Sequence, residues 1–346
     1  MAVNHRVELR RPVAGRPAAD DFVVVEGQVP EPGPSEALIR VEALSLDPYM
    51  GSALKGRHMS GRIAPGDLMP GEGVGRVIRS RTPDLPEGAT VIARTGWQDF
   101  AVMAPADPAL AGMAAALAPG ARVLDAAPSI PPSAYLGVLG MPGLTAYAGT
   151  VHVLAPRPGE TFVVSSCTGG VGSAAGQVAA IMGARVVGIA GSTEKCAFAV
   201  DALGFAACVD RTDPAWVDAL GAACPDGVDA YFDCAGGEVL AGVMRRLALG
   251  ARIGLCGMMD QYNADGVLAG PSLAPVLGRR AAIRGIVVYD HWGEMARWRR
   301  LGAAWIAGGR LAYRESRSHG LATAPAAFAA MMAGANFGKT VVVLDG

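Results

Sequence analysis

The chain has 346 residues, a net charge of −1 and no basic tract, which excludes a nucleic-acid partner of the usual electrostatic kind. Every long apolar run is broken by Gly, Pro or charge, so we expect no membrane partner. This length favours two domains. The six cysteines form no C-x-x-C pair and residues 1–12 lack an apolar signal core, so we expect reduced thiols in a cytoplasmic protein.

The first third of the chain has the pattern of a β-barrel or sandwich. Short apolar runs alternate with turns rich in Pro and Gly, which is typical of many short strands. The predicted strands are Phe22–Glu26, Leu38–Glu42, Val74–Ile78, Thr90–Ala93 and Phe100–Met103. The Ala- and Pro-rich stretch at residues 125–133 favours a domain boundary there.

From about residue 131 onward, strands and helices alternate, which predicts an α/β domain with a parallel sheet covered on both faces. Predicted strands are Thr161–Ser165, Arg185–Ala190, Val228–Asp233, Arg252–Cys256 and Ala282–Tyr289, and predicted helices include Pro214–Ala222 and Glu238–Leu247. After Leu311 a strand, an Ala-rich helix (Ala324–Ala333) and a last strand (Lys339–Leu344) follow.

Residues 161–195 give the clearest functional signal. An apolar strand enters a glycine turn, an Ala-rich helical segment follows, and a second strand comes next, as a dinucleotide pyrophosphate requires. Gly169 allows the tight turn, Gly172 lets the backbone approach the phosphate, and the N–H groups of the helix start face the anion. The predicted pyrophosphate-binding residues are Gly169, Gly170, Val171, Gly172 and Ser173.

The end of the second strand indicates which nicotinamide dinucleotide binds. NAD-binding folds place an acidic residue about twenty residues on, for the ribose 2′-OH. This chain has Gly191-Ser192-Thr193-Glu194-Lys195 instead, and a hydroxyl with a lysine suits the 2′-phosphate of NADP(H). The alternative is that Ser192 caps a helix and Lys195 is a solvated residue of its first turn.

Further motifs point to a family. They are LSLDPYM (44–50), GWQDF (96–100), YLGVLGMPGLTAY (135–147), CGMMDQYN (256–263) and NFGKT (336–340). From residue 30 to 343 the chain resembles the zinc-independent medium-chain dehydrogenase/reductases, in the group of prostaglandin reductases (leukotriene hydroxydehydrogenases) and alkenal or curcumin double-bond reductases. The resemblance implies a GroES-like barrel for substrate at residues 1–126, a Rossmann NADP-binding domain at 127–309, and a segment 310–346 that returns to the barrel.

The resemblance also implies a reaction. Relatives use NADPH to reduce a C=C bond conjugated to a ketone or aldehyde, with hydride delivered to the β-carbon. Zinc-dependent relatives carry a Cys and a His-Glu pair where this chain reads Leu46-Asp47-Pro48-Tyr49 and Pro70-Gly71-Glu72-Gly73-Val74. The lobe of four clustered cysteines is missing too. Since catalytic zinc needs three protein ligands, we expect no metal in this site.

Two tyrosines are the candidate catalytic residues. Conjugate reduction builds negative charge on the carbonyl oxygen, so a hydrogen-bond donor is needed there. The resemblance gives this role to Tyr262, and the alternative is a tyrosine that closes a loop by packing. Tyr49, which follows Pro48, is either a substrate wall and second donor or an ordinary barrel aromatic.

The resemblance extends the cofactor site to residues with less specific patterns: Arg211, Cys256, Gly257, Tyr262, Ile286, Val287, Val288 and Asn336. The alternatives are a surface arginine, a turn-forming asparagine and a plain core strand. Cys234 stands where relatives have an asparagine, so that contact is open. We expect surface or loop roles for the histidines His58, His152, His291 and His319.

Three other functions share this fold: quinone reduction, non-catalytic NADP binding, and an enoyl-reductase module of a larger synthase. The retained Tyr262 and Asn336 disfavour a mere binder, and the absence of linker sequence disfavours a synthase module. The resemblance also implies a homodimer, which the apolar run 282–289 could form by pairing at a sheet edge.

Overall fold

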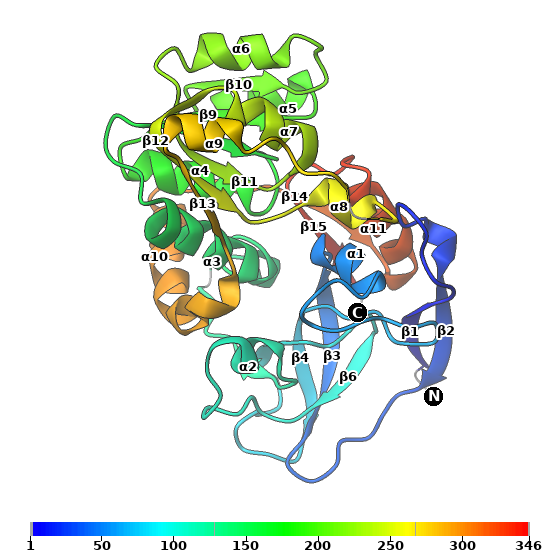
Figure 1. Cartoon of the computed structure of the whole chain (residues 1–346). Helices are drawn as coiled ribbons and strands as arrows, with labels where there is room; N and C mark the ends of the chain where they lie inside the picture. Colours follow the sequence, from blue (N-terminus) through cyan, green and yellow to red (C-terminus); the bar gives the residue numbers. More distant parts are fainter. Residues whose placement is uncertain (1–2, 128, 267, 345–346) are drawn as a thin grey trace. The chain divides into compact units, whose positions relative to one another are not determined.

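The computed structural model describes residues 3–127, 129–266 and 268–344. The chain forms two compact units, each described here by itself: unit 1 comprises Met1–Gly137 with Glu315–Gly346, and unit 2 comprises Val138–Arg314 (Figure 1). The predicted fold class, a Rossmann-like parallel sheet with a separate sheet domain, is confirmed. Within the described residues, no helix is long and apolar enough to cross a bilayer.

Unit 1 is built mainly from β-strands. An antiparallel ribbon of β1 and β2 accompanies a seven-stranded sheet in the order β14-β15-β3-β4-β5-β7, with β6 paired to β3. The strands are β1 (Val3–Leu9), β2 (Phe22–Gln28), β3 (Ala37–Ser45), β4 (Gly73–Ser80), β5 (Thr90–Ala93), β6 (Phe100–Met103), β7 (Arg122–Val123), β14 (Glu315–His319) and β15 (Lys339–Val343). The helices are η1 (Ala19–Asp21), α1 (Tyr49–Leu54), α2 (Gly112–Leu117), η2 (Pro132–Leu136), η5 (Leu321–Thr323) and α11 (Ala324–Met332).

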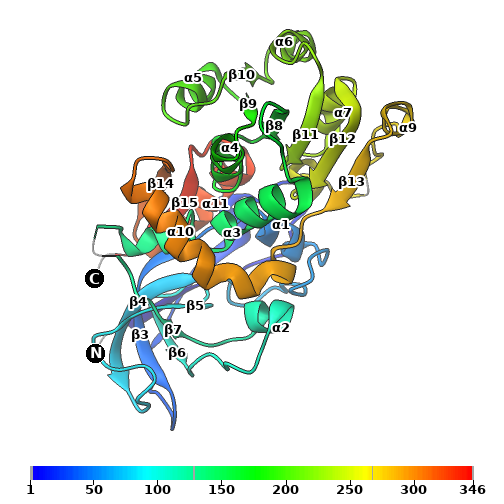
Figure 2. The ribbon, with the colours of Figure 1, turned by 90° about the vertical axis from the view of Figure 1, so that its left-hand side faces the viewer.

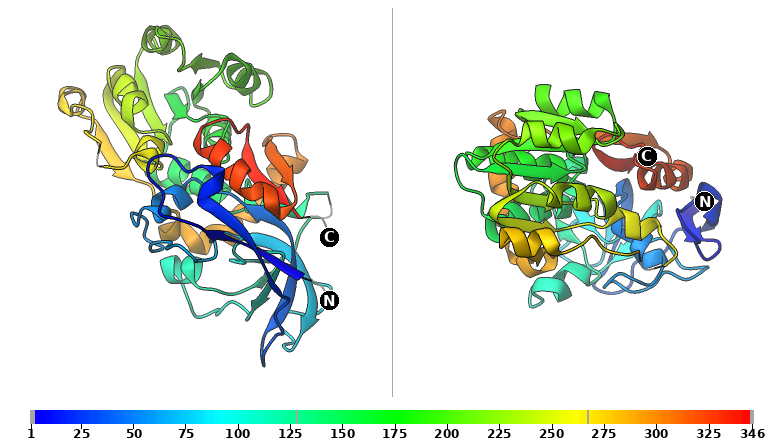
Figure 3. Two further views of the ribbon diagram at one scale, coloured as in Figure 1. Left: turned by 90° about the vertical axis from the view of Figure 1, so that its right-hand side faces the viewer. Right: turned by 45° about the horizontal axis from the view of Figure 1, so that its top comes forward.

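The C-terminal segment completes unit 1. Strand β15 pairs antiparallel with β3, so the red end of the chain lies beside blue strands in Figure 3. A cluster of three buried aromatic rings joins the same parts: Phe22 of β2, Trp97 and Phe328 of α11 have ring centroids 5.5–6.1 Å apart. Burial of rings of this size supplies much of the hydrophobic stabilisation of a small core.

A buried ion pair crosses from β15 to the turn that follows β3. The Lys339 ammonium donates to the Asp47 carboxylate and to the Leu46 carbonyl, each at 2.6 Å. The Ser45 hydroxyl donates to the other carboxylate oxygen at 2.5 Å. Lys339 and Asp47 are each 6% exposed, so their charges are compensated within the protein.

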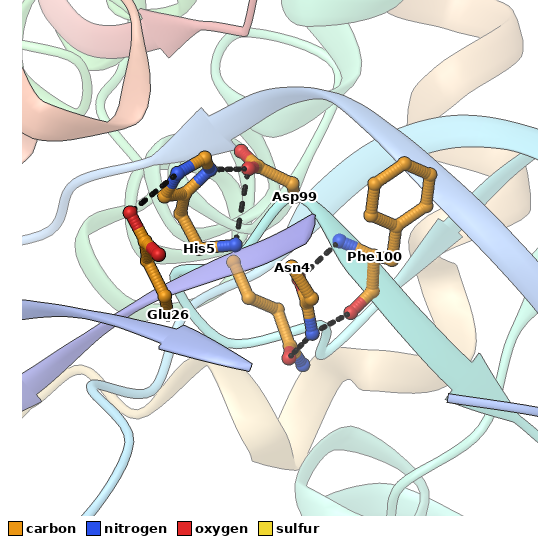
Figure 4. A network of polar contacts seen from close by, with 6 residues as sticks. Asn4, His5, Glu26, Asp99 and Phe100 are labelled. Atoms are coloured by element: carbon orange, nitrogen blue, oxygen red, sulfur yellow. Dashed lines mark hydrogen bonds and ion pairs between the residues drawn. The ribbon is translucent and has the colours of Figure 1, made fainter. Parts of the chain in front are cut away.

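A polar network holds the N-terminal strand to the segment before β6 (Figure 4). His5 contacts the Asp99 carboxylate through its ring, at 2.7 Å, and through its backbone N–H. The Asn4 side chain accepts from the backbone N–H of Phe100 and donates to its carbonyl. Asn4 therefore satisfies an edge of β6 that β3 does not cover.

Unit 2 contains six parallel strands in the order β10-β9-β8-β11-β12-β13. The order reverses between β8 and β11, which is the switch point where open α/β sheets bind ligands. Helices cover both faces: Figure 2 shows α3 and α4 on one side of these strands and α7 and α9 on the other. The strands are β8 (Thr161–Ser165), β9 (Arg185–Ala190), β10 (Ala207–Asp210), β11 (Val228–Asp233), β12 (Leu247–Leu255) and β13 (Ala282–Gly285). The helices are α3 (Met141–Ala148), η3 (Gly149–Leu154), α4 (Gly172–Ile181), α5 (Thr193–Asp201), α6 (Trp216–Ala223), α7 (Gly237–Met244), α8 (Met259–Asn263), α9 (Ala274–Arg279), η4 (Val288–Glu294) and α10 (Met295–Ala307).

Some predicted boundaries in unit 2 are wrong. The strand predicted over 282–289 ends at Gly285, and a 3₁₀-helix begins at Val288. The Ile286 side chain fills the core beside Gly149 and Gly254, where an added Cβ would lie 2.7–2.8 Å from its Cδ1. The predicted helix 238–247 ends at Met244 because β12 already begins at Leu247.

The Lys339–Asp47 pair gives a stability prediction. Asp47→Ala strands a buried ammonium, so we expect a loss of roughly 3–5 kcal/mol in the free energy of unfolding, measured by urea denaturation. The double variant Asp47→Leu/Lys339→Met removes both charges, so it should regain most of that loss. Equal destabilisation of the single and double variants would show that the charge is not the cause.

Candidate active site

The junction of β8 and α4 carries the predicted glycine turn. Ser166 is its left-handed residue, with φ of 48°, where the sequence pointed to Gly169 for the tight turn. The Gly169 N–H donates to the Ser166 carbonyl at 2.8 Å. A Cβ on Gly172 would lie 2.4 Å from that same carbonyl oxygen. Gly172 therefore lets α4 start directly against the end of β8, besides its predicted role toward phosphate.

The five predicted pyrophosphate residues run from this turn into the first turn of α4. The Ser173 N–H already donates to the Gly169 carbonyl at 3.1 Å, so the helical hydrogen bonding begins there. The first N–H groups of a helix have no acceptor within the helix, and the helix dipole adds positive potential. This end of a ten-residue helix is thus shaped for an anion.

Asp233, at the end of β11, organises the neighbouring edge of the sheet. It is fully buried, and its Oδ1 accepts from the Ser165 and Tyr231 hydroxyls at 3.1 and 2.7 Å. The same oxygen accepts from the backbone N–H groups of Ala235 and Gly236. Burial raises the pKa of Tyr231 far above its usual value, so this phenol is a fixed donor. The carboxylate thereby fixes the ends of β8 and β11 together.

Cys256 and Gly257, predicted for the cofactor, lie against this loop. Both N–H groups donate to the Asp233 carbonyl, at 2.8 and 3.1 Å. Because those N–H groups are engaged, a cofactor contact is left to the carbonyl oxygens of Cys256 and Gly257 or to the Cys256 side chain. The Cys234 thiol has its pKa raised by a hydrogen bond with Cys256 and by burial, so it stays a neutral thiol.

Two cations meet at the tips of β9 and β10. The Arg211 guanidinium passes over Gly191, where an added Cβ would lie 3.6 Å from its Nε. Burial and then the Arg211 charge lower the pKa of Lys195, while Glu194 acts more weakly in the opposite direction. The Ser192 hydroxyl accepts from the Lys195 N–H at 3.3 Å, so the helix cap of the predicted alternative is confirmed, whereas Lys195 is half-buried and not fully solvated. An anion placed between the two cations would relieve their repulsion.

Asp260 is a residue that the sequence reasoning missed. Its carboxylate occupies the space above Gly237, where a Cβ would lie 1.8 Å from Oδ2. Burial raises its pKa, and the charge of Arg211 opposes that shift. Asp260 therefore competes with any anion for Arg211. Only its position two residues before Tyr262 could have drawn attention to it.

Tyr262 lies on the short helix α8, which follows β12. Burial raises the pKa of its phenol, and a backbone hydrogen bond from Met258 opposes the shift. At neutral pH the group is an uncharged donor in a half-buried position. This is the electrostatic state that the predicted hydrogen-bond donor requires.

Tyr49 lies in unit 1, at the start of α1 and two residues after Asp47. Its ring centroid is 4.7 Å from that of His58. Burial, with a contribution from Arg94, lowers the pKa of His58, so the imidazole is neutral. A pocket of about 230 Å³ is lined by residues that follow Tyr49 in the sequence. None of the described residues that line it is a predicted site residue. It is lined by Ser60, Gly61, Arg62, Ile63, Asp67, Leu68, Pro70 and Arg94.

The remaining predicted cofactor residues have local structural roles. The Asn336 amide donates to the Gly338 carbonyl at 2.9 Å, which is the turn-forming alternative. Ile286 and Val288 are buried, Val287 is half-buried, and the Ile286 N–H donates to the Leu255 carbonyl. The predicted core alternative therefore holds for Ile286, and a backbone contact of this segment with the cofactor remains a proposal.

The residues at the zinc position of related dehydrogenases do not fit a metal. The resemblance places one ligand position in the stretch 46–49, where Asp47 is the only acidic residue, and its carboxylate is already engaged by the Lys339 ammonium and the Ser45 hydroxyl. A divalent ion there would have to displace a buried cation that has no other acidic partner in the described contacts. Chemistry that depends on a zinc-polarised oxygen is therefore not supported at this position.

Comparison with known proteins finds relatives that are similar along almost the whole chain. Residues 5–110 match the model described as the N-terminal domain of oxidoreductase, and residues 170–304 match the model described as zinc-binding dehydrogenase. The chain is 36% identical to the NADPH-dependent curcumin reductase of Escherichia coli (strain K12) over 99% of its length and 97% of the relative. It is 33% identical to the NADP(+)-dependent 2-alkenal reductase of Nicotiana tabacum, over 99% and 98%.

A solved structure agrees. The crystal structure of CurA from Vibrio vulnificus in complex with NADPH has a TM-score of 0.90 and 36% identity, and the match covers 99% of each chain. The resemblance inferred from the motifs is thereby confirmed. The protein belongs to the zinc-independent medium-chain dehydrogenase/reductases, in the group that includes the curcumin and alkenal double-bond reductases.

Proposed function

We propose that the protein reduces the C=C bond of α,β-unsaturated ketones and aldehydes with NADPH, without a metal. The observation that carries this proposal is the buried Lys339–Asp47 pair, because Asp47 belongs to the stretch 46–49 where, by the resemblance, zinc-dependent relatives carry a ligand. Carbonyl and alcohol chemistry in zinc-dependent relatives needs a Lewis acid, whereas conjugate reduction needs a hydride and hydrogen-bond donors. Relatives along the whole chain are named for reductions of this kind.

NADPH, when bound, supplies the hydride. We assign its diphosphate to Gly169, Gly170, Val171, Gly172 and Ser173, and its 2′-phosphate to Ser192, Lys195 and Arg211. Cys256, Gly257, Ile286, Val287, Val288 and Asn336 complete the proposed contacts toward the nicotinamide. The anion-shaped helix start and the two converging cations support the first two assignments. Asp260 makes Arg211 the weaker of the two phosphate partners.

Tyr262 is the proposed donor to the substrate carbonyl. As hydride reaches the β-carbon, negative charge builds on the oxygen, and a neutral, half-buried phenol stabilises it by hydrogen bonding. Tyr49, from unit 1, is proposed as a wall of the substrate site and as a second donor. The roles of unit 1 in substrate binding and of unit 2 in cofactor binding belong to the same proposal.

We also propose a homodimer and a cytoplasmic location. Strand β13 is an edge of its sheet and all four of its residues are exposed, with Ile283 at 36%. An exposed edge is suited to pairing with a second copy. A mass of one chain in analytical ultracentrifugation would contradict the dimer. All six cysteines are free, which fits a reducing compartment, and fractionation would test the location.

The reaction is tested with purified protein, NADPH or NADH, and four acceptors. The acceptors are a short trans-2-alkenal, an aryl enone, a quinone and a saturated aldehyde, with loss of reduced-nicotinamide absorbance as the readout. We expect turnover of the alkenal and the enone, faster with NADPH, and none of the saturated aldehyde. Turnover of the quinone alone would favour quinone reduction, and NADPH binding without turnover would favour a non-catalytic protein.

Lys195 tests the 2′-phosphate assignment. Lys195→Ala removes a charged hydrogen bond worth about 1.5–3 kcal/mol, so the KM for NADPH should rise roughly 10–100-fold. The KM for NADH should change little because it has no 2′-phosphate. Lys195→Arg keeps the charge and is the matched control. Equal effects of Lys195→Ala on both cofactors would contradict the assignment.

Tyr262 tests the mechanism. Tyr262→Phe should lower kcat by roughly 10²–10⁴-fold while the Kd for NADPH stays the same. Because the pKa of the phenol is raised, wild-type turnover should show no loss from its ionisation below about pH 10. Tyr313→Phe, in the same unit, is the control. Unchanged turnover of Tyr262→Phe would remove this residue from the mechanism.

A further inference from the structure

Two histidines and a glutamate from distant parts of unit 2 form a cluster that the proposed reaction does not use. His152 lies on η3, and His291 and Glu294 lie on η4. Their ligand atoms all lie within 4.8 Å of one another. His152 Nε2 is 2.9 Å from Glu294 Oε1, and His291 Nδ1 is 3.5 Å from the same oxygen.

We propose that this cluster is an accessory site for a borderline divalent metal ion of the Zn²⁺ class. Two imidazoles and one carboxylate form a donor set that proteins use for zinc, with water at the fourth position. Imidazole also suits Co²⁺, Ni²⁺ and Cu²⁺, whereas Ca²⁺ and Mg²⁺ prefer oxygen-only sites. This position is separate from the stretches 46–49 and 70–74 of unit 1, where the resemblance places the zinc ligands of related dehydrogenases.

The distances between the donor atoms of the cluster are close to those of a zinc site, so only a small rearrangement of side chains is needed. In a tetrahedral zinc site, ligand bonds of about 2.0–2.1 Å put donor atoms about 3.3 Å apart. The His291–Glu294 distance of 3.5 Å already fits, and the direct His152–Glu294 contact of 2.9 Å would open. The two rings are nearly parallel, at 9° and 5.1 Å, so both must turn about χ2 for their lone pairs to converge. That torsion is broad for histidine.

The surroundings both hold and expose the donors. The Tyr147 ring lies edge-on to His152 and stacks on the buried Trp298, whose indole N–H donates to the Val138 carbonyl. The histidine therefore stands on a rigid base, which lowers the ordering cost of binding. The side chains of His152, His291 and Glu294 are 35%, 24% and 27% exposed, which leaves an ion and its water a path.

One nearby group opposes a metal. Arg297 Nη1 lies 3.7 Å from Glu294 Oε2, and its charge repels a divalent cation. The arginine side chain is 64% exposed, so it can turn away into solvent when an ion binds. The Arg297 charge should weaken metal binding without abolishing it. Removal of this charge should therefore tighten metal binding, which tests the proposal.

An ion here would link η3 to η4 and the start of α10. Helix α3 leads into η3, and η4 leads into α10. Figure 2 shows α3 and α10 side by side. Residues Ile286–Val288 are proposed to contact the nicotinamide. The linkage would restrain the segment that follows them. The site itself does not depend on the proposed reaction.

The test uses the full chain after chelator treatment. Zn²⁺ is titrated by calorimetry, and Co²⁺ by its visible d–d absorption. We expect one ion per chain, no thiolate charge-transfer band, and a zinc-dependent rise in Tm. His152→Ala, His291→Ala and Glu294→Gln should each weaken binding by at least about tenfold, and the rise in Tm should disappear in Glu294→Gln. Arg297→Gln should instead tighten binding a few-fold.

His319→Ala, a histidine in unit 1, is the matched control and should bind like the wild type. The proposal would be overturned by the lack of stoichiometric binding in the wild type, or by binding in all three ligand variants that is as tight as in the wild type. A charge-transfer band from sulfur would assign the ion to cysteines and would overturn it too. Because Arg297→Gln should gain affinity, a loss of folding cannot imitate the full pattern.

Discussion

The Lys339–Asp47 ion pair is the constraint on which unit 1 depends. Neither charge can stay buried alone, so β15, almost at the end of the chain, must return to the turn after β3. The same turn places Tyr49 two residues later. The carboxylate that closes the unit belongs to the stretch 46–49, where the resemblance places a ligand of the zinc-dependent relatives. Because this carboxylate is already engaged by a buried ammonium, the interaction that stabilises the split unit also makes Asp47 a poor metal ligand.

Unit 2 uses a buried carboxylate in a comparable way. Asp233 accepts four hydrogen bonds at one oxygen and fixes the ends of β8 and β11, which flank the switch point of the sheet. The backbone N–H groups of Cys256 and Gly257, directly after β12, bond to its carbonyl, so this edge is held before any ligand arrives. In the proposed assignment, cofactor choice falls to side chains near the tips of β9 and β10. A bound 2′-phosphate would there offset the repulsion between Lys195 and Arg211.

Local sequence patterns predicted the features that depend on neighbouring residues, such as strand bounds and a helix cap. Strands β8, β9 and β11 have their predicted bounds because short apolar runs end at polar or glycine turns, and the Ser192 cap follows from its position before a helix. The strand over 282–289 was extended too far because the apolar run continues, although Ile286 turns into the core. The histidine–glutamate cluster was missed because 142 residues separate His152 from Glu294, and only tertiary folding joins them.

The state of Tyr262 limits what it can do in a metal-free site. A phenol whose pKa is raised by burial holds its proton more tightly than free tyrosine, so it stabilises an enolate by hydrogen bonding better than by giving the proton up. Proton transfer to oxygen would create a phenolate, the form that partial burial of this side chain disfavours. The proton that completes the α-carbon should therefore come from water. Tyr262 would then orient the substrate and lower the barrier to hydride transfer, and Tyr262→Phe should slow hydride transfer more than it slows protonation.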